Sequence, residues 1–143
     1  MSEPRREEFL RAVLDRLLPA YKELPGAGSL GLAARVEQEL KVDEHWAGAR
    51  KALARLPEDF HALDGTAQDG ALRTLERTAP QAFAQLVELA YGAYYTDARV
   101  LRWVERETGY GARPPQPLGY ELAPFDEARL ATVRCRPPFY RQV

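Results

Sequence analysis

Apolar residues recur along this chain with the spacing of helix faces, and no stretch alternates with a period of two for long enough to predict a strand. The first pattern predicts a helix over residues 3–18. Prolines and a glycine then interrupt the pattern and predict a loop over residues 21–28. Ser29 and Asp43 follow at positions suited to cap a second and a third helix, because their side-chain oxygens can accept hydrogen bonds from the first turn.

The middle of the chain predicts a short turn and two further helices. The turn lies at Phe60 and Leu63, and Thr66 with Asp69 resembles a capping box at the start of the next helix. Pro80 suits the first position of the helix after that. That helix has the strongest apolar periodicity in the chain, so we expect it at the centre of a bundle. Its apolar positions are Phe83, Leu86, Val87, Ala90, Tyr91 and Tyr94. If Tyr91 faces the core, Tyr94 must leave that face.

The last third of the chain is rich in proline. Thr96 or Asp97 can cap a short helix, which Gly109 ends. Four prolines between residues 110 and 125 exclude a helix or a central strand there. Asp126 can cap one last short helix.

These patterns together predict an all-α fold, with residues 1–143 forming a single domain of about five or six helices. In this prediction residues 1–109 form the core of the helical bundle. Residues 110–143 form a long Pro- and Tyr-rich extended segment with one short helix, and this segment wraps the bundle. With 143 residues, of which 45% are hydrophobic, the chain can bury a core of its own.

Charge and cysteine content narrow the classes of partner. The chain has 20 Lys and Arg against 21 Asp and Glu, interspersed along its length, which argues against binding to nucleic acid. No apolar run reaches the roughly 18 residues that span a bilayer, so we expect no direct membrane insertion. The single cysteine, Cys135, lies between two arginines but has no identifiable general base, and we interpret it as a structural thiol.

No motif in the chain predicts a catalytic, cofactor or metal site. His45 and His61 have no partner at the spacing of helix ligands, which argues against a zinc or di-iron site. The string Gly26-x-Gly28-x-x-Gly31 has the form of a dinucleotide fingerprint, but a helix and a loop precede it where that motif requires a strand. We therefore predict no catalytic residue, no bound cofactor and no metal ligand in this chain.

The stretch from Tyr91 to Tyr120 contains five of the seven tyrosines and one of the two tryptophans. Two interpretations are open. In the first, this stretch wraps the bundle and buries its rings; in the second, it contacts a partner, because Tyr, Trp and Arg are common anchors of interfaces. The candidate partner-binding residues are Tyr91, Tyr94, Tyr95, Thr96, Trp103, Tyr110, Arg113, Pro115, Pro117, Tyr120, Phe139, Tyr140 and Arg141.

Three elements of this region recur in the same order in a known family. They are Tyr94-Tyr95-Thr96, Gly109-Tyr110 and the run from Pro114 to Tyr120. Over residues 83–141 the chain resembles the gluconate 2-dehydrogenase subunit 3 family. Members of that family are small helical subunits of membrane-associated, FAD-dependent dehydrogenases of the GMC type, which oxidise sugars and sugar acids.

The resemblance implies a non-catalytic accessory subunit of an oxidoreductase complex. Its partner would be a large FAD-dependent GMC-type dehydrogenase, which the small subunit binds, stabilises or helps to mature, and the FAD would lie in that partner. Many family members supply a twin-arginine leader, but here Arg5-Arg6 is followed by Glu7 and no leader precedes Phe9. We expect a cytoplasmic protein as sequenced, or a periplasmic or membrane-associated complex if a partner carries it out.

Two alternatives from other classes stay open. One is a stand-alone enzyme or small-ligand-binding protein, with a pocket under the Pro-rich segment that uses the tyrosines and Arg113. The other is a self-associating structural domain, in which a symmetric homo-oligomer covers the aromatic surface.

Overall fold

The computed structural model describes residues 3–111 and 124–136, and the chain divides into two compact units, Met1–Ala112 and Arg113–Val143. The regular elements among the described residues are all helices, with no strand, which confirms the all-α prediction. The prediction of a single domain stays a prediction. The α-helices of the first unit are α1 (Glu3–Leu17), α2 (Ala33–Val42), α3 (Ala47–Leu53), α4 (Gly65–Thr78), α5 (Pro80–Tyr95) and α6 (Ala98–Thr108). Short 3₁₀ helices cover Glu44–Trp46 and Phe60–Ala62. In the second unit, a 3₁₀ helix over Glu127–Leu130 leads into α7 (Ala131–Arg134).

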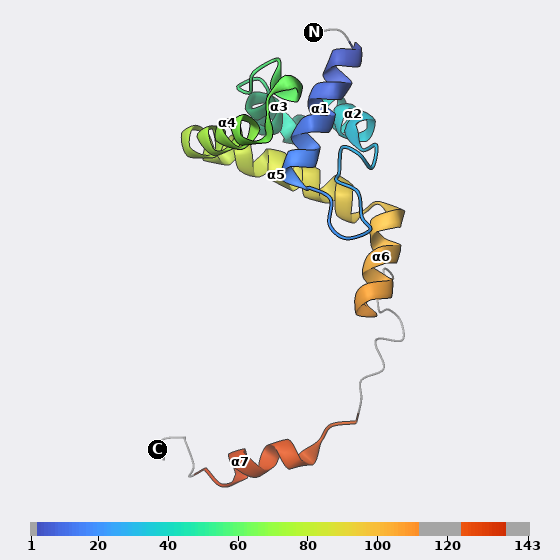
Figure 1. The fold of residues 1–143 in the computed structure, drawn as a ribbon. Coiled ribbons are helices and arrows are strands. Elements are labelled where there is room, and N and C mark those ends of the chain that lie inside the picture. The colour runs from blue at the N-terminus through green and yellow to red at the C-terminus, as the bar shows by residue number, and fades with distance from the viewer. Residues whose placement is uncertain (1–2, 112–123, 137–143) are drawn as a thin grey trace. The chain divides into compact units, whose positions relative to one another are not determined.

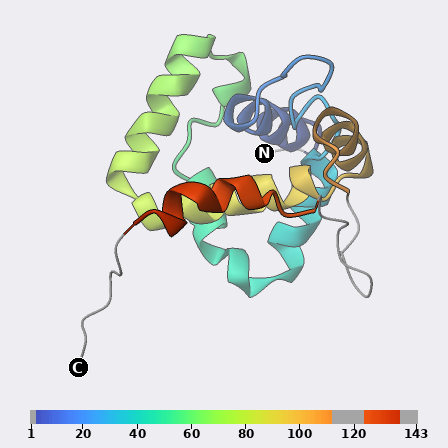
Figure 2. The same cartoon turned by 90° about the horizontal axis from the view of Figure 1, so that it is seen from below.

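Helix α5 is the centre of the first unit, as its periodicity predicted. It contacts α1, α2, α3, α4 and α6, and Figures 1 and 2 show α4 and α6 at its opposite ends. The core includes two aromatic rings, Phe9 of α1 and Phe60 of the second 3₁₀ helix, whose centroids lie 6.2 Å apart in an edge-to-face contact. Both side chains are almost fully buried, so the predicted turn at Phe60 does pack on the core.

Several predicted helix ends are confirmed by the hydrogen bonds that cap them. The Asp43 carboxylate accepts from the backbone N–H of His45, although the element it caps begins as a 3₁₀ turn. Pro80 occupies the first turn of α5. Of the two residues proposed to cap α6, Asp97 does so, and Gly109 ends this helix in the left-handed conformation with φ 70°. Asp126 caps the 3₁₀ helix that precedes α7.

Two predicted caps are wrong. Ser29 does not cap α2, which begins after Leu32 without a side-chain cap. Asp64, rather than the pair Thr66 and Asp69, caps α4 by accepting from the N–H of Ala67. In both cases the residue expected to cap has a partner that is distant in sequence.

Those distant partners lie on α1. The Ser29 N–H and hydroxyl donate to the carboxylate of Asp15, at 2.8 and 2.9 Å. Asp69 accepts from the Arg16 guanidinium, with 2.6 Å between Nη2 and Oδ2, and this contact holds the pKa of Asp69 below its usual value. Side chains of α1 thus tie down both the loop before α2 and the start of α4.

The loop between α1 and α2 packs closely on α1. A Cβ at Gly28 would lie 2.0 Å from the carbonyl oxygen of Arg11, so only glycine fits there. This contact gives the Gly-x-Gly string a packing role. Earlier in the same loop, Tyr21 and Leu24 exchange backbone hydrogen bonds of 2.9 and 3.0 Å and form a tight turn.

No helix in the described parts of the chain is both long and apolar enough to cross a bilayer.

Candidate partner interface

The last turns of α5 carry three tyrosines that contact one another. Tyr94 is buried, with 4% of its surface exposed, whereas Tyr91 and Tyr95 are 45% and 48% exposed. The ring centroid of Tyr95 lies 5.6 Å from that of Tyr91 and 5.3 Å from that of Tyr94. Two exposed rings therefore form a small aromatic surface, which Tyr94 supports from the core.

This arrangement reverses the sequence interpretation, which put Tyr91 on the core face of α5 and Tyr94 off it. The prediction is wrong because the core face of the helix is turned toward two positions outside the predicted pattern, Leu89 and Ala93. Turning the face in that direction brings Tyr94 inward and leaves Tyr91 in solvent.

Tyr94 also connects α5 to the loop between α1 and α2. Its hydroxyl donates to the carbonyl oxygen of Pro25 at 3.3 Å. Burial raises the pKa of this hydroxyl, and the neighbouring Tyr95 raises it further. The group therefore stays protonated and can donate at any ordinary pH.

Three other predicted interface residues lie before, within and after α6. The Thr96 hydroxyl donates to the carbonyl of Gly92 at 2.6 Å, so it satisfies a carbonyl in the last turn of α5. Trp103 of α6 is partly buried against the core. Tyr110 follows α6, is 65% exposed, and its backbone N–H donates to the hydroxyl of Thr108.

The remaining predicted interface residues are not tested by the structure. They lie outside the described residues, and they are Arg113, Pro115, Pro117, Tyr120, Phe139, Tyr140 and Arg141.

A groove of about 350 Å³ lies between the turn at residues 21–25 and α6. The ring of Tyr21 meets Trp103 edge-on, with 6.1 Å between centroids, and Lys22 lies over both rings. Lys22 also pairs with Glu107 at 3.6 Å. The groove lining comprises Glu23, Leu24, Pro25, Leu30, Arg99, Arg102, Trp103 and Arg106.

Three arginines of α6 line this groove. Arg99 makes two hydrogen bonds to Asp97, of 2.9 and 2.8 Å, and donates to the carbonyl of Leu30 at 2.8 Å. The hydrogen bond from Arg99 lowers the pKa of Asp97 to about 2. Arg106 pairs with Glu23 across the groove. The third arginine, Arg102, is exposed.

The sequence analysis missed this groove, although part of its signal is local. The three arginines recur at i, i+3 and i+7 in the helix that the sequence predicted, which places them on one face. The other wall was not predictable in this way, because Tyr21 and Trp103 are 82 positions apart in the sequence (103 − 21) and nothing local connects them.

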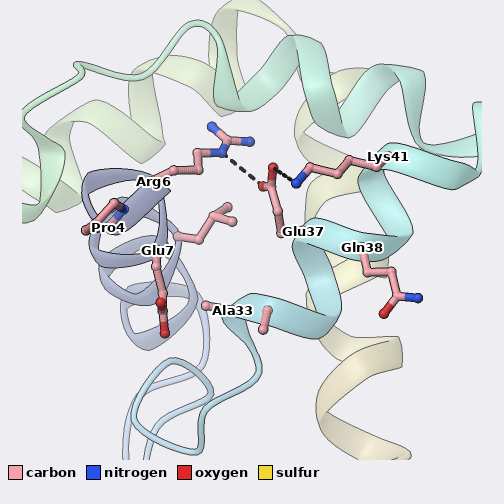
Figure 3. Close-up of a pocket in the computed structure, with 9 residues that line it drawn as sticks. Pro4, Arg6, Glu7, Ala33, Glu37, Gln38 and Lys41 are labelled. Carbon is pink, nitrogen blue, oxygen red and sulfur yellow. Dashed lines mark hydrogen bonds and ion pairs between the residues drawn. The ribbon is translucent and has the colours of Figure 1, made fainter. Parts of the chain in front are cut away.

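A second cavity, of about 550 Å³, lies between α1 and α2 and is distant in sequence from the tyrosines (Figure 3). Arg6 and Lys41 both pair with Glu37 there, at 3.0 and 3.6 Å. Leu10 and Ala33 give the cavity an apolar floor. The charged groups at its centre are thus already engaged with one another.

Among the described residues, no three His, Cys, Asp or Glu side chains come together as a metal site would require. His45 packs against the ring of Trp46, and His61 lies 3.9 Å from Glu8. Cys135 is exposed, and its interpretation as a structural thiol stays a prediction.

Comparison with known proteins identifies the family. The family model described as gluconate 2-dehydrogenase subunit 3 matches residues 4–109. No match was found among curated proteins or among solved structures. The matched region runs from α1 to the end of α6, so it includes Tyr94-Tyr95-Thr96 but not the run from Pro114 to Tyr120 on which the resemblance also drew. Because the match spans more than half of the chain, this protein belongs to the gluconate 2-dehydrogenase subunit 3 family, whose name denotes a subunit of a dehydrogenase.

Proposed function

We propose that this chain is a non-catalytic small subunit that binds a large FAD-dependent dehydrogenase of the GMC type and stabilises it or helps it to mature. The partner would oxidise a sugar, sugar acid or alcohol. The flavin and the groups that act on the substrate belong to the partner in this proposal, because the organic chemistry of such enzymes is that of the cofactor. Membership of the subunit 3 family supports a dehydrogenase as the partner.

The structural observation that carries the proposal is the exposed pair of rings at the end of α5. About half of the surface of Tyr91 and of Tyr95 is in solvent, and the two ring centroids lie 5.6 Å apart. Tyrosine is enriched at the centres of interfaces. Their contacts with each other and with Tyr94 already restrict the two rings, so a partner that covers them loses little side-chain entropy on binding.

The proposal is tested by affinity capture of the tagged full-length chain from its native host, followed by an absorbance scan of the captured material. We expect one large protein in a fixed ratio to the chain, with the absorbance of bound flavin. A colourless preparation that contains only this chain, as a monomer or as a symmetric dimer, would overturn the proposal and favour the self-contained alternatives.

Substitutions then test whether the α5 surface takes part. Tyr91→Ala and Tyr95→Ala are each expected to weaken binding to the captured dehydrogenase by ~1–3 kcal/mol if the rings are anchors. Val42→Ala is the control, because Val42 is an exposed apolar side chain at the end of α2, with 75% of its surface in solvent. If both tyrosine variants bind as the control does, the interface lies elsewhere on the molecule.

A further inference from the structure

The groove between the turn at residues 21–25 and α6 combines an apolar floor with a charged rim. Its floor contains Leu24 and Leu30, which are 8% and 5% exposed, and its wall includes the ring of Trp103. Its volume of about 350 Å³ is enough for one or two side chains of an extended segment, at the lower end of the range for ligand sites. The groove can therefore hold a short part of another chain.

The groove lining has more arginine side chains than carboxylates. Arg99 is paired with Asp97, and Arg106 with Glu23 and Glu107. Arg102 lies between them on the same face of α6, and it makes no hydrogen bond or ion pair within residues 3–111 and 124–136. Among the described residues, Arg102 is thus the guanidinium of this face that has no carboxylate partner, and it lies in the groove lining.

A second polar group in the groove wall lacks a partner. The indole N–H of Trp103 is covered by protein atoms and has no acceptor among the described residues. Because protein atoms cover this nitrogen, an oxygen atom in the groove does not reach it, and the acceptor that an occupant of the groove can supply is the one for Arg102.

We propose that this groove binds an acidic, extended segment of the dehydrogenase, with a carboxylate of that segment paired to Arg102; this inference rests on the function proposed above. A planar guanidinium can hold a carboxylate through two parallel hydrogen bonds. The neighbouring residues of the segment lie on Leu24, Leu30 and the Trp103 ring. An acidic segment is favoured over a basic or neutral one because a carboxylate completes the row of three arginine–carboxylate pairs on α6.

The groove and the aromatic surface of α5 are joined by contacts. Pro25 lines the groove and accepts the hydrogen bond from Tyr94, whose ring contacts that of Tyr95. The groove and the exposed ring of Tyr95 thus belong to one connected set of contacts, and we assign both to the same partner.

The test compares Arg102 variants of the full-length chain in binding to the purified dehydrogenase, at low and at high salt. Arg102→Gln is expected to weaken binding roughly tenfold, and Arg102→Glu by more, because it adds repulsion to the loss of the pair. Arg102→Lys should retain part of the affinity, since it keeps the charge but not the planar fork. The wild-type affinity should fall with added salt more steeply than that of Arg102→Gln.

The matched control is Arg77→Gln. Arg77 is exposed on α4, at the opposite end of α5, and has no hydrogen bond or ion pair in the described part of the chain (Figure 1). Because neither arginine supports the fold through a polar contact, both variants should unfold at the same temperature as the wild type. This equality separates lost binding from lost folding.

The possible outcomes distinguish failure of the acidic-segment inference from failure of the proposed function. If the dehydrogenase binds the wild type and Arg102→Glu equally well, this inference is overturned and the proposed function stands. A loss at Arg102→Gln that does not depend on salt would indicate an uncharged acceptor and would also overturn the acidic segment. If no dehydrogenase binds the wild type at all, the proposed function fails and takes this inference with it.

Discussion

Gly28 lies where the loop between α1 and α2 touches the backbone of α1. A Cβ added at this position would lie 2.0 Å from the carbonyl oxygen of Arg11 and 2.9 Å from its Cα. Both atoms belong to the main chain of a helix, so neither can rotate away. Gly28→Ala therefore forces the loop to retreat by roughly 1 Å or more before ordinary van der Waals distances are restored.

That displacement has a cost that the structure allows us to estimate. The same loop buries Leu24, Ala27 and Leu30, and it holds Ser29 on Asp15. Overpacking of a dense interior typically costs 1–3 kcal/mol, and more where the neighbouring atoms cannot move. We expect Gly28→Ala to lower the free energy of unfolding by about 3 kcal/mol.

Gly70→Ala is the matched control. Gly70 lies inside α4, and a Cβ there would meet no atom within 4 Å. The same substitution should therefore stabilise the protein by about 0.5–1 kcal/mol, because alanine loses less backbone entropy than glycine in a helix. Two chemically identical changes are thus expected to have opposite signs.

The assay is unfolding by urea and, separately, by heat, monitored by the circular dichroism of the helices, on the wild type and both variants. For a domain of this size the expected differences correspond to midpoint temperatures about 10 °C lower for Gly28→Ala and a few degrees higher for Gly70→Ala. If Gly28→Ala unfolds within 0.5 kcal/mol of the wild type, on the order of an ordinary surface change, the close approach of the loop to α1 is refuted.

Three further substitutions test other contacts. Tyr94→Phe removes the donor to Pro25 and should cost about 0.5–1.5 kcal/mol in urea unfolding, the usual net contribution of one neutral hydrogen bond. Phe60→Ala empties a fully buried position and should cost about 3–5 kcal/mol by the same assay; a loss under ~1 kcal/mol would contradict the core assignment. Asp97→Asn keeps the helix cap but removes the charge beside Arg99. The lowered pKa of Asp97, about 2, sets a ceiling of about 2 kcal/mol on this pair, and we expect about 1 kcal/mol because the Arg99 side chain is 53% exposed. A carboxylate whose pKa is lowered by folding stabilises the fold above its unfolded pKa, so the difference between wild type and Asp97→Asn should be complete above about pH 4 and shrink toward pH 2, and a pH-independent difference would contradict it.

The sequence predicted those parts of the fold that depend on local order. The helix periods gave the all-α class and the central position of α5, because a 3.6-residue repeat reports which side of a helix is apolar. Asp43 and Asp126 were predicted as caps, and Asp97 was one of two candidates with Thr96. These predictions succeed because each aspartate accepts a hydrogen bond from a backbone N–H only two residues further on. Such bonds need no information from the rest of the chain.

Predictions failed where a side chain has a choice between a local and a distant partner. Ser29 could cap a helix, but it bonds to Asp15, which lies 14 positions earlier. Asp69 could complete a capping box, but it pairs with Arg16, 53 positions away. The direction of Tyr94 depends on the loop that accepts its hydroxyl. Nothing in the local pattern decides among these options, because tertiary packing supplies the competing partner.

The candidate surfaces follow the same division. The arginine row of α6 can be read from helix spacing, whereas the spacing placed Tyr91 and Tyr94 on the wrong sides of α5. The groove exists only because the loop before α2 is held by contacts at three places. Gly28 brings it to α1, Tyr94 joins it to α5, and Arg106 joins it to α6 through Glu23. Each fastening connects segments that are distant in sequence, so the groove is a property of the folded chain and not of any motif. An acidic partner segment would recognise this arrangement, and for that reason loosening the loop at Gly28 should weaken binding even though Gly28 itself touches no partner.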